Sequence, residues 1–201
     1  MPLLNGIEHP AALRARYRPE LVAPGIIRVE STRVAPGRIV QGSPFVEIDL
    51  ASATVAPARL AALAAVLEAA GIRTRTKEDE AATLWGKLIF IAPVALMTTR
   101  HRVPVGIIRT EHRAEFIALL DEIAELSRVA GLPDDVDAVL RFCDSFPPET
   151  KSSMLRDAEA DRPLEVDALG GALLRVALRN GVSMPLTERL VDDVSRAAAA
   201  E

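Results

Sequence analysis

A single lysine stands in a long apolar run, and its type and position make it the first candidate for chemistry. The run covers residues 84–97, Leu-Trp-Gly-Lys-Leu-Ile-Phe-Ile-Ala-Pro-Val-Ala-Leu-Met, with the cation at Lys87. An ammonium group in such surroundings must keep its head in water, pair with a carboxylate or take part in a reaction. A candidate partner region lies far downstream, at residues 151–157 and then Glu165. A positioned lysine can act as a general acid and as an electrostatic stabiliser.

Length and composition limit the fold and the class of protein. The 201 residues suit one large domain or two small ones. With 49% hydrophobic but only 3% aromatic residues, aliphatic residues and alanine must build the core, which favours closely packed helices. The net charge of −4 argues against a nucleic-acid partner, because nucleic-acid-binding proteins usually carry a basic stripe.

Cysteine usage and hydropathy bear on the compartment. The single cysteine, Cys143, excludes an intrachain disulfide and a multi-cysteine zinc site, and it suits a reducing cytoplasm. Residues 1–4 lack the basic flank and apolar core of a signal peptide, and the longest apolar run, residues 88–97, is too short to span a bilayer. We therefore expect a soluble, cytoplasmic protein with no membrane partner.

The elements that must position these residues fall into two parts. Residues 1–80 show a mixed α/β pattern. Helices are predicted at 10–17 and 57–70, and strands at 25–30, 38–41, 45–48 and 72–76. A turn signal, Ala35-Pro36-Gly37, favours a hairpin between the first two strands.

From residue 80 onward the pattern is helical. Apolar residues recur with a 3.6-residue period through 116–129, and Gly131-Leu132-Pro133 stops that helix. Further helices are predicted at 134–146, 149–157, 166–179 and 185–199. We therefore expect a domain boundary near residue 80.

A series of short motifs follows one another along nearly the whole chain. They are Leu4-Asn5-Gly6, Pro24-Gly25, Ala35-Pro36-Gly37-Arg38-Ile39, Trp85-x-Lys87, Ser152-Ser153-Met154 with Asp157, Glu165-Val166-Asp167, Gly170 and Pro185. In order and spacing they resemble the C-terminal part of the ketopantoate reductase (2-dehydropantoate 2-reductase) family. The resemblance implies an α/β remnant of a Rossmann-type, nucleotide-binding domain at 1–80, followed by an all-α C-terminal domain for substrate and dimerisation at 81–201.

The resemblance also implies an activity and assigns roles to four residues. The family reduces a 2-keto acid to a 2-hydroxy acid with NADPH, a pantothenate-pathway reaction that delivers a hydride to C2 and a proton to the developing alkoxide. By resemblance, Lys87 is the catalytic acid, and Glu165 binds substrate and orients the site. Asn5 and Ser153 match the asparagine and the serine that contact substrate.

The cofactor site implied by the family has a gap in this sequence. The phosphate-binding Gly-x-Gly-x-x-Gly turn, which lets a pyrophosphate meet a helix N-terminus, has no counterpart here. We therefore expect a natural fragment, a truncated gene model or a proteolysed product. Such a chain should bind NADP(H) weakly by itself and leave ketopantoate unreduced.

One departure bears on the substrate. A well-studied branch of the family places asparagines four and eight residues after the lysine, where they bind substrate. This chain has Ile91 and Ala95 at those positions. Because a buried substrate hydroxyl without partners is penalised, the change favours a substrate less polar than ketopantoate.

Ordinary structural roles compete with these assignments. Lys87 can be a snorkelling surface lysine, Ser152 or Ser153 can bond to helix backbone, and Glu165 can cap the helix that follows. By default Asn5-Gly6 signals a turn, and Trp85 suits a packing position.

The remaining candidate ligands favour no metal site. His9, His101 and His112 share no metal-like spacing, so we expect scattered surface positions for them. Cys143 lies on an apolar helical face and is expected in the core.

Three functions remain open. The chain can be the C-terminal part of a reductase, with Lys87 and Glu165 facing one cleft. It can be a non-enzymatic helical association remnant that binds another copy or a separate nucleotide-binding segment. It can also be a small-ligand-binding protein. An uncovered sheet edge and apolar faces favour pairing, so we expect a homodimer or a higher assembly.

Overall fold

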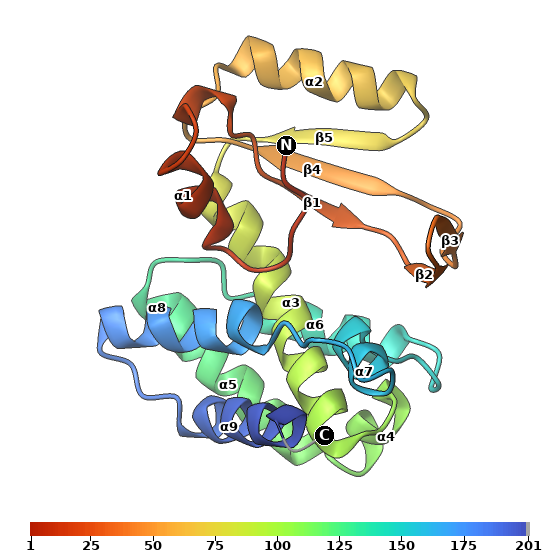
Figure 1. The fold of residues 1–201 in the computed structure, drawn as a ribbon. Coiled ribbons are helices and arrows are strands. Elements are labelled where there is room, and N and C mark those ends of the chain that lie inside the picture. Colours follow the sequence, from red (N-terminus) through yellow and green to blue (C-terminus); the bar gives the residue numbers. More distant parts are fainter. Residues whose placement is uncertain (200–201) are drawn as a thin grey trace. The chain divides into compact units, whose positions relative to one another are not determined.

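The computed structural model describes residues 1–199, which form two compact units. We call them the α/β unit, with residues 1–4 and 8–84, and the helical unit, with residues 5–7 and the chain from residue 85 onward. Helix α3 (Glu80–His101) contributes to both, because the division falls after its first turn. Figure 1 follows the chain through these elements.

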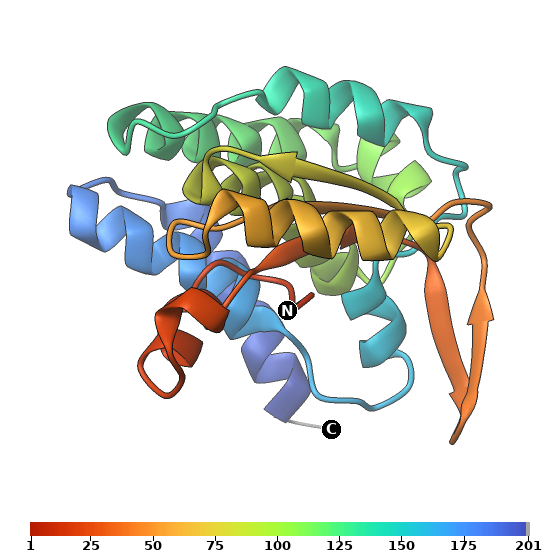
Figure 2. The same cartoon turned by 90° about the horizontal axis from the view of Figure 1, so that it is seen from above.

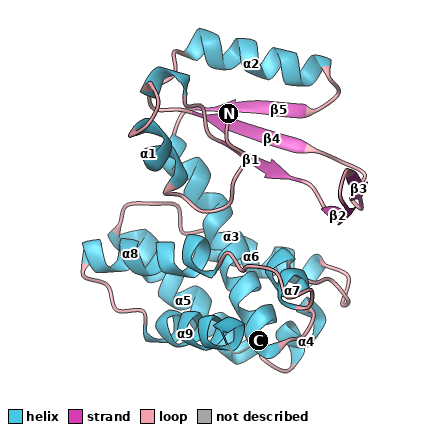
Figure 3. Cartoon of the chain, in the orientation of Figure 1, coloured by secondary structure: helices cyan, strands magenta, loops and turns pink. Residues whose placement is uncertain are grey.

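The α/β unit holds all the strands found among the described residues, which Figure 3 colours magenta. They are β1 (Gly25–Arg28), β2 (Ser31–Ala35), β3 (Arg38–Gln41), β4 (Glu47–Ala51) and β5 (Arg73–Lys77). The unit also contains helices α1 (His9–Arg14) and α2 (Pro57–Ala69) and a 3₁₀ turn at Pro19–Leu21. This confirms the mixed α/β pattern predicted for the first 80 residues.

A three-stranded sheet in the order β1-β4-β5 forms the centre of this unit. Strand β1 pairs antiparallel with β4, and β4 pairs parallel with β5. The connection from β4 to β5 is α2, because parallel neighbours need a crossover, and Figure 1 shows α2 lying along the sheet. Helix α2 starts at Pro57, as predicted, and Gly71 follows its end with a φ of 81°.

The predicted hairpin has a different first strand. Strand β3 pairs with β2, whereas β1 pairs with β4 in the sheet. The turn at residues 35–37 was placed correctly, but the partner was wrong, because the largely exposed β2 lacks the apolar alternation that marks a strand. Figure 2 shows this hairpin as a separate two-stranded arm.

The helical unit surrounds the C-terminal part of α3 with further helices. They are α4 (Val105–Thr110), α5 (Arg113–Val129), α6 (Val136–Ser145), α7 (Ser153–Ala158), a π-helical turn at Asp167–Gly171, α8 (Ala172–Asn180) and α9 (Pro185–Ala199). Helix α5 contacts α4, α6, α8 and α9. The prediction of an all-helical C-terminal part is confirmed, although α4 was missed and α7 is shorter than expected.

Helix α3 supplies one side of a large apolar core. Leu88, Ala92 and Leu96 are buried there together with Leu119 and Ile123 of α5. By length and composition alone α3 could also cross a membrane, which corrects the expectation that the apolar run is too short. This is weak evidence for a membrane span, because the mostly buried core helix of a soluble protein passes the same test.

Candidate functional site

Three residues near the N-terminus belong to the helical unit. Gly6 adopts a left-handed φ of 81°, and a Cβ atom at this position would lie only 2.6 Å from the carbonyl oxygen of Ala168. Glycine therefore allows the segment to lie directly against the π-helical turn. Ile7 packs against the core of the unit. The Asn5-Gly6 turn signal thus marks a close approach between distant parts of the chain.

This close approach brings two predicted site residues together. Asn5 Nδ2 donates a hydrogen bond of 2.8 Å to Glu165 Oε2, across 160 positions of sequence. The Glu165 side chain is exposed and stands two residues before the π-helical turn. The Asn5 amide therefore orients one of the two carboxylate oxygens of Glu165.

The π-helical turn after Glu165 is itself held by close packing. A Cβ atom at Gly170 would lie 2.3 Å from Val191 Cγ2 of α9. Asp167, the first residue of the turn, forms an ion pair of 2.6 Å with Arg175 of α8. Such single-turn π segments occur frequently at functional sites.

Lys87 lies on α3, next to a rigid anchor. Trp85 is buried, and its indole Nε1 donates to Ser127 Oγ at 3.0 Å and to the carbonyl oxygen of Pro133 at 3.1 Å. These bonds fix the rotation of the helix around Lys87. The side chain of Lys87 is half-buried, and its helix neighbours Leu84 and Leu88 are buried. Trp85 thus has the packing role expected from its sequence position.

The two serines at the start of α7 have different surroundings. Ser152 is the N-cap residue, and its Oγ accepts a hydrogen bond of 3.0 Å from the backbone N–H of Leu155. The same hydroxyl lies 2.7 Å from Thr98 Oγ1 of α3. Ser153, the residue singled out by the resemblance, is exposed. The alternative that one serine bonds to the helix backbone is confirmed for Ser152, and the substrate role of Ser153 stays a prediction.

The face of α3 between Lys87 and the serines is mostly apolar. Thr98 lies eleven residues beyond Lys87, about 16 Å along the helix axis. Between them, Ala95 is buried in the core and Ile91 packs partly buried against it. The polar groups on this face are therefore separated by an aliphatic stretch.

Cys143 is inert in these surroundings. The side chain is buried on α6, and burial raises the pKa of the thiol to about 12, with a further increase from Asp144 and a decrease from Arg109. Because the thiolate is the nucleophile, a thiol that stays protonated suits packing rather than catalysis. The prediction of a core cysteine is confirmed.

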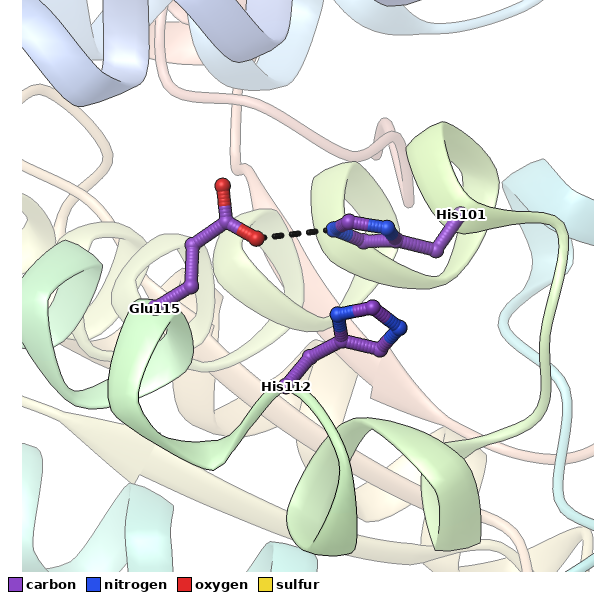
Figure 4. A group of neighbouring side chains, drawn as sticks. All are labelled: His101, His112 and Glu115. Carbon is purple, nitrogen blue, oxygen red and sulfur yellow. Dashed lines mark hydrogen bonds and ion pairs between the residues drawn. The ribbon is translucent and has the colours of Figure 1, made fainter.

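The expectation of scattered histidines was wrong for two of the three. The rings of His101 and His112 stack with centroids 3.8 Å apart, and His101 Nε2 lies 2.8 Å from Glu115 Oε2 (Figure 4). A sequence signal was present, because residues three apart at a helix start, such as His112 and Glu115, share one face. No local sequence pattern indicates that His101, at the end of α3, lies beside these two residues.

A hollow of about 510 Å³ lies elsewhere on the helical unit. Its lining residues come from the end of α3, the segment after α7 and the end of α9: Thr99, Arg100, Arg102, Ala158, Asp161, Arg162, Pro163, Leu164, Asp193, Val194, Ala197 and Ala198. None of the four predicted site residues is among them.

The α/β unit thus contains a parallel β4–α2–β5 crossover, and the all-helical unit joins Asn5 to Glu165 by a hydrogen bond. A family model described as "Ketopantoate reductase PanE/ApbA C terminal" matches residues 79–197. The chain therefore belongs to the ketopantoate reductase family, as its motifs predict.

Similar proteins extend the match over nearly the whole chain. The 2-dehydropantoate 2-reductase of Caulobacter vibrioides is 28% identical over 204 residues, which cover 98% of this chain and 67% of that protein. The crystal structure of 2-dehydropantoate 2-reductase from Geobacter metallireducens GS-15 is 29% identical, with a TM-score of 0.88, over 97% of this chain and 67% of that one.

A second solved structure shows similarity of the fold alone. D-mandelate dehydrogenase, solved with NADH and anilino(oxo)acetate, is 22% identical, with a TM-score of 0.87, over 98% of this chain and 67% of that one. This chain therefore spans about two thirds of the length of all three proteins.

Proposed function

We propose that this chain carries the substrate-binding and proton-donating part of an enzyme that reduces a 2-keto acid to a 2-hydroxy acid. The observation that supports it most is the Asn5–Glu165 hydrogen bond of 2.8 Å. The family resemblance assigns both residues to substrate contact, and the fold brings them together from opposite ends of the chain. The names of the relatives support the same reaction class.

In the proposed reaction, Lys87 works at the carbonyl oxygen. Its ammonium group donates a hydrogen bond to the oxygen on C2, stabilises the charge that develops there and then transfers the proton to the alkoxide. Such proton transfer typically contributes about 10²–10⁴-fold to the rate. Glu165, held in place by the Asn5 amide, helps to bind the substrate and to orient the site around C2.

A nicotinamide cofactor supplies the hydride in this family, and the residues of this chain fit only part of its site. Among the 11 glycines of the sequence no two are separated by a single residue, so no Gly-x-Gly turn exists to hold a pyrophosphate. This chain alone therefore offers no cradle for the pyrophosphate of a nicotinamide cofactor. The β4–α2–β5 crossover supports the view that the α/β unit is part of a Rossmann-type domain, and NADPH as the preferred cofactor is part of the same proposal.

The aliphatic stretch on α3 points to the kind of substrate. Ile91, which is partly buried one helical turn after Lys87, offers no hydrogen bond to a group bound beside the lysine, and Ala95 is buried in the core. A polar substituent placed there would lose its bonds to water without replacement, which costs about 1–3 kcal/mol. We therefore propose a 2-keto acid with an apolar side chain rather than ketopantoate.

Calorimetry on the full chain tests the proposal through binding. An apolar 2-keto acid such as phenylglyoxylate should bind, and Lys87→Ala should weaken its affinity about 10- to 100-fold, because a hydrogen bond to a charged group is lost. Lys77→Ala is the matched control, since Lys77 is exposed at the end of β5. Equal affinity for the two variants, or no binding at millimolar concentrations, would contradict the proposal.

Three earlier predictions belong to this proposal. A homodimer, or pairing with a separate nucleotide-binding segment, stays a prediction. So does the placement of Lys87 and Glu165 at one cleft. A cytoplasmic location agrees with the reaction class and with the free thiol of Cys143.

A further inference from the structure

Three side chains with metal-binding atoms meet where α3 ends and α5 begins. His101 is the last residue of α3, His112 is the N-cap residue of α5, and Glu115 lies in the first turn of α5. One ligand atom from each of the three lies within 4.8 Å of the others. Figure 4 shows both rings and the carboxylate turned toward one another.

The carboxylate of Glu115 is held from its far side. Arg189 Nη2 of α9 donates a hydrogen bond of 2.9 Å to Glu115 Oε1, whereas Oε2 faces His101 Nε2 at 2.8 Å. An outer partner that orients a carboxylate in this way is common around bound metals. One carboxylate oxygen of Glu115 thus binds the arginine, and the other faces His101.

The site is also reachable from solvent. The side chains of His101 and Glu115 are 18% and 27% exposed. They are therefore sheltered enough to be ordered and open enough to admit an ion.

A shared proton explains only part of this arrangement. It accounts for the contact between His101 and Glu115, but not for a second imidazole stacked 3.8 Å away at an angle of 24°. Two protonated rings so close would repel each other. Two neutral imidazoles and one carboxylate, by contrast, are a common ligand set for zinc.

We propose that His101, His112 and Glu115 bind one divalent transition-metal ion, with Zn²⁺ as the reference ion. Bonds of about 2.0–2.2 Å in tetrahedral geometry place two ligand atoms roughly 3.3 Å apart. The ligand atoms lie within 4.8 Å of one another, so binding would draw them closer and turn the two stacked rings toward the ion. Three protein ligands leave the fourth position to water.

The bound ion would tie α3 to α5 across the short helix α4. All three ligands belong to the helical unit, so the site does not depend on the proposed reductase activity. Because the ion binds the folded arrangement and not the separated ligands, it should stabilise this unit.

The test titrates the chelator-treated full chain with Zn²⁺ by calorimetry and with Co²⁺ by visible absorption. We expect one ion per chain and a tetrahedral Co²⁺ spectrum. His101→Gln and His112→Gln should each weaken Zn²⁺ affinity at least about 100-fold, since loss of a direct ligand exceeds the usual effect of an outer partner.

Two control variants separate the site from general metal binding. His9→Gln changes the third histidine, which lies in the α/β unit, and Glu125→Gln changes an exposed carboxylate of α5 that pairs with Arg128. Both should keep the affinity of the unaltered chain. Controls that lose binding as strongly as the site variants would overturn the proposal.

A measurement on the unaltered chain guards against variants that fail to fold. Zn²⁺ should shift the imidazole NMR signals of two histidines at one equivalent and leave the third unchanged. The absence of any shift at millimolar Zn²⁺, or equal shifts at all three histidines, would overturn the proposal.

Discussion

The α/β unit and the helical unit achieve their stability in different ways. In the helical unit, a continuous apolar cluster runs through α3, α5, α8 and α9. In the α/β unit, the buried apolar cluster comprises six of the described residues: Ala23, Ile48, Leu50, Val55, Leu60 and Ala64. Apolar burial scales with area, so the helical unit gains much more from it.

In the α/β unit, two carboxylates that are largely shielded from solvent bind arginines. Asp49, buried in the central strand β4, accepts hydrogen bonds from Arg28 at 2.9 Å and Arg75 at 2.7 Å. Glu80 accepts two from Arg14 at 2.7 Å and one from the backbone N–H of Ala53 at 2.8 Å. The comparison teaches that the helical unit should respond mainly to lost volume, whereas the α/β unit should respond to lost charge as well.

The largest effect is expected for Trp85→Ala in the helical unit. The change removes a fully buried side chain and its two hydrogen bonds, so it should lower the free energy of unfolding by about 3–5 kcal/mol. Urea unfolding followed by far-UV circular dichroism measures it, because the sequence has only 1 tryptophan and fluorescence is lost.

A matched change in the small core is Leu60→Ala. Leu60 is buried on α2, where the few neighbours can relax around the lost atoms, so about 2 kcal/mol is expected. If Leu60→Ala cost as much as Trp85→Ala, the two cores would not differ in the way described.

Local signals explain which parts of the fold were predictable. The helices that start at Pro57 and Pro185 were placed nearly to the residue, because proline fixes the first turn. The pairing of β1 with β4 was missed, because it joins segments about twenty residues apart through contacts that no local pattern encodes. The π-helical turn at residues 167–171 depends on packing against α9 and was read as plain helix.

The candidate site was predictable only through resemblance. Nothing in the local sequence of Asn5 or Glu165 indicates that the two side chains meet, since 160 positions separate them. The histidine cluster shows the opposite case. Its His-x-x-Glu spacing is visible in the sequence at residues 112–115. Only the structure shows that His101, at the end of α3, lies beside these two residues and completes the cluster.

A further prediction concerns close packing in the helical unit. Gly170→Ala places a Cβ atom against Val191 Cγ2, a stiff β-branched side chain, and should lower the free energy of unfolding by about 1–3 kcal/mol. The double variant Gly170→Ala with Val191→Ala should recover part of this loss. Thermal and urea unfolding of the single and double variants form the double-mutant cycle.

Gly86→Ala is the matched control on α3. Gly86 is exposed, and a Cβ atom there meets nothing within 4 Å. Alanine should therefore raise the stability by about 0.5–1 kcal/mol through its higher helix propensity. A Gly170→Ala variant that also gained stability would show that the π-helical turn is not packed as tightly as described.

The prediction that sharpens the comparison most concerns charge in the α/β unit. Asp49→Asn keeps the volume of the side chain but removes its charge. It should cost about 1–2 kcal/mol near neutral pH, less than a fully buried pair, because both arginines are about half exposed and can return to water.

The pH dependence of this effect has a definite sign. Burial disfavours the charged carboxylate of Asp49, but the hydrogen bonds from Arg75 and Arg28 outweigh it and hold its pKa below the usual 3.8. A lowered pKa in the folded state gives stability that is fully present above about pH 4 and is lost as the pH falls through the folded value. The pKa of Glu80 is lowered from 4.5 in the same way: burial opposes the charge, and the bonds from Arg14 and Ala53 prevail.

Urea unfolding between pH 7 and pH 3 therefore distinguishes the two units. The unaltered chain should lose stability below about pH 4, and hydrogen exchange should show that the α/β unit opens first. In the Asp49→Asn variant the loss of stability should be shallower, because one of the two arginine-bound carboxylates no longer takes up a proton, while Glu80 still does. An equally steep decline in both proteins would mean that Asp49 contributes nothing to acid sensitivity. The contrast between the two units in their dependence on charge would then not hold for Asp49.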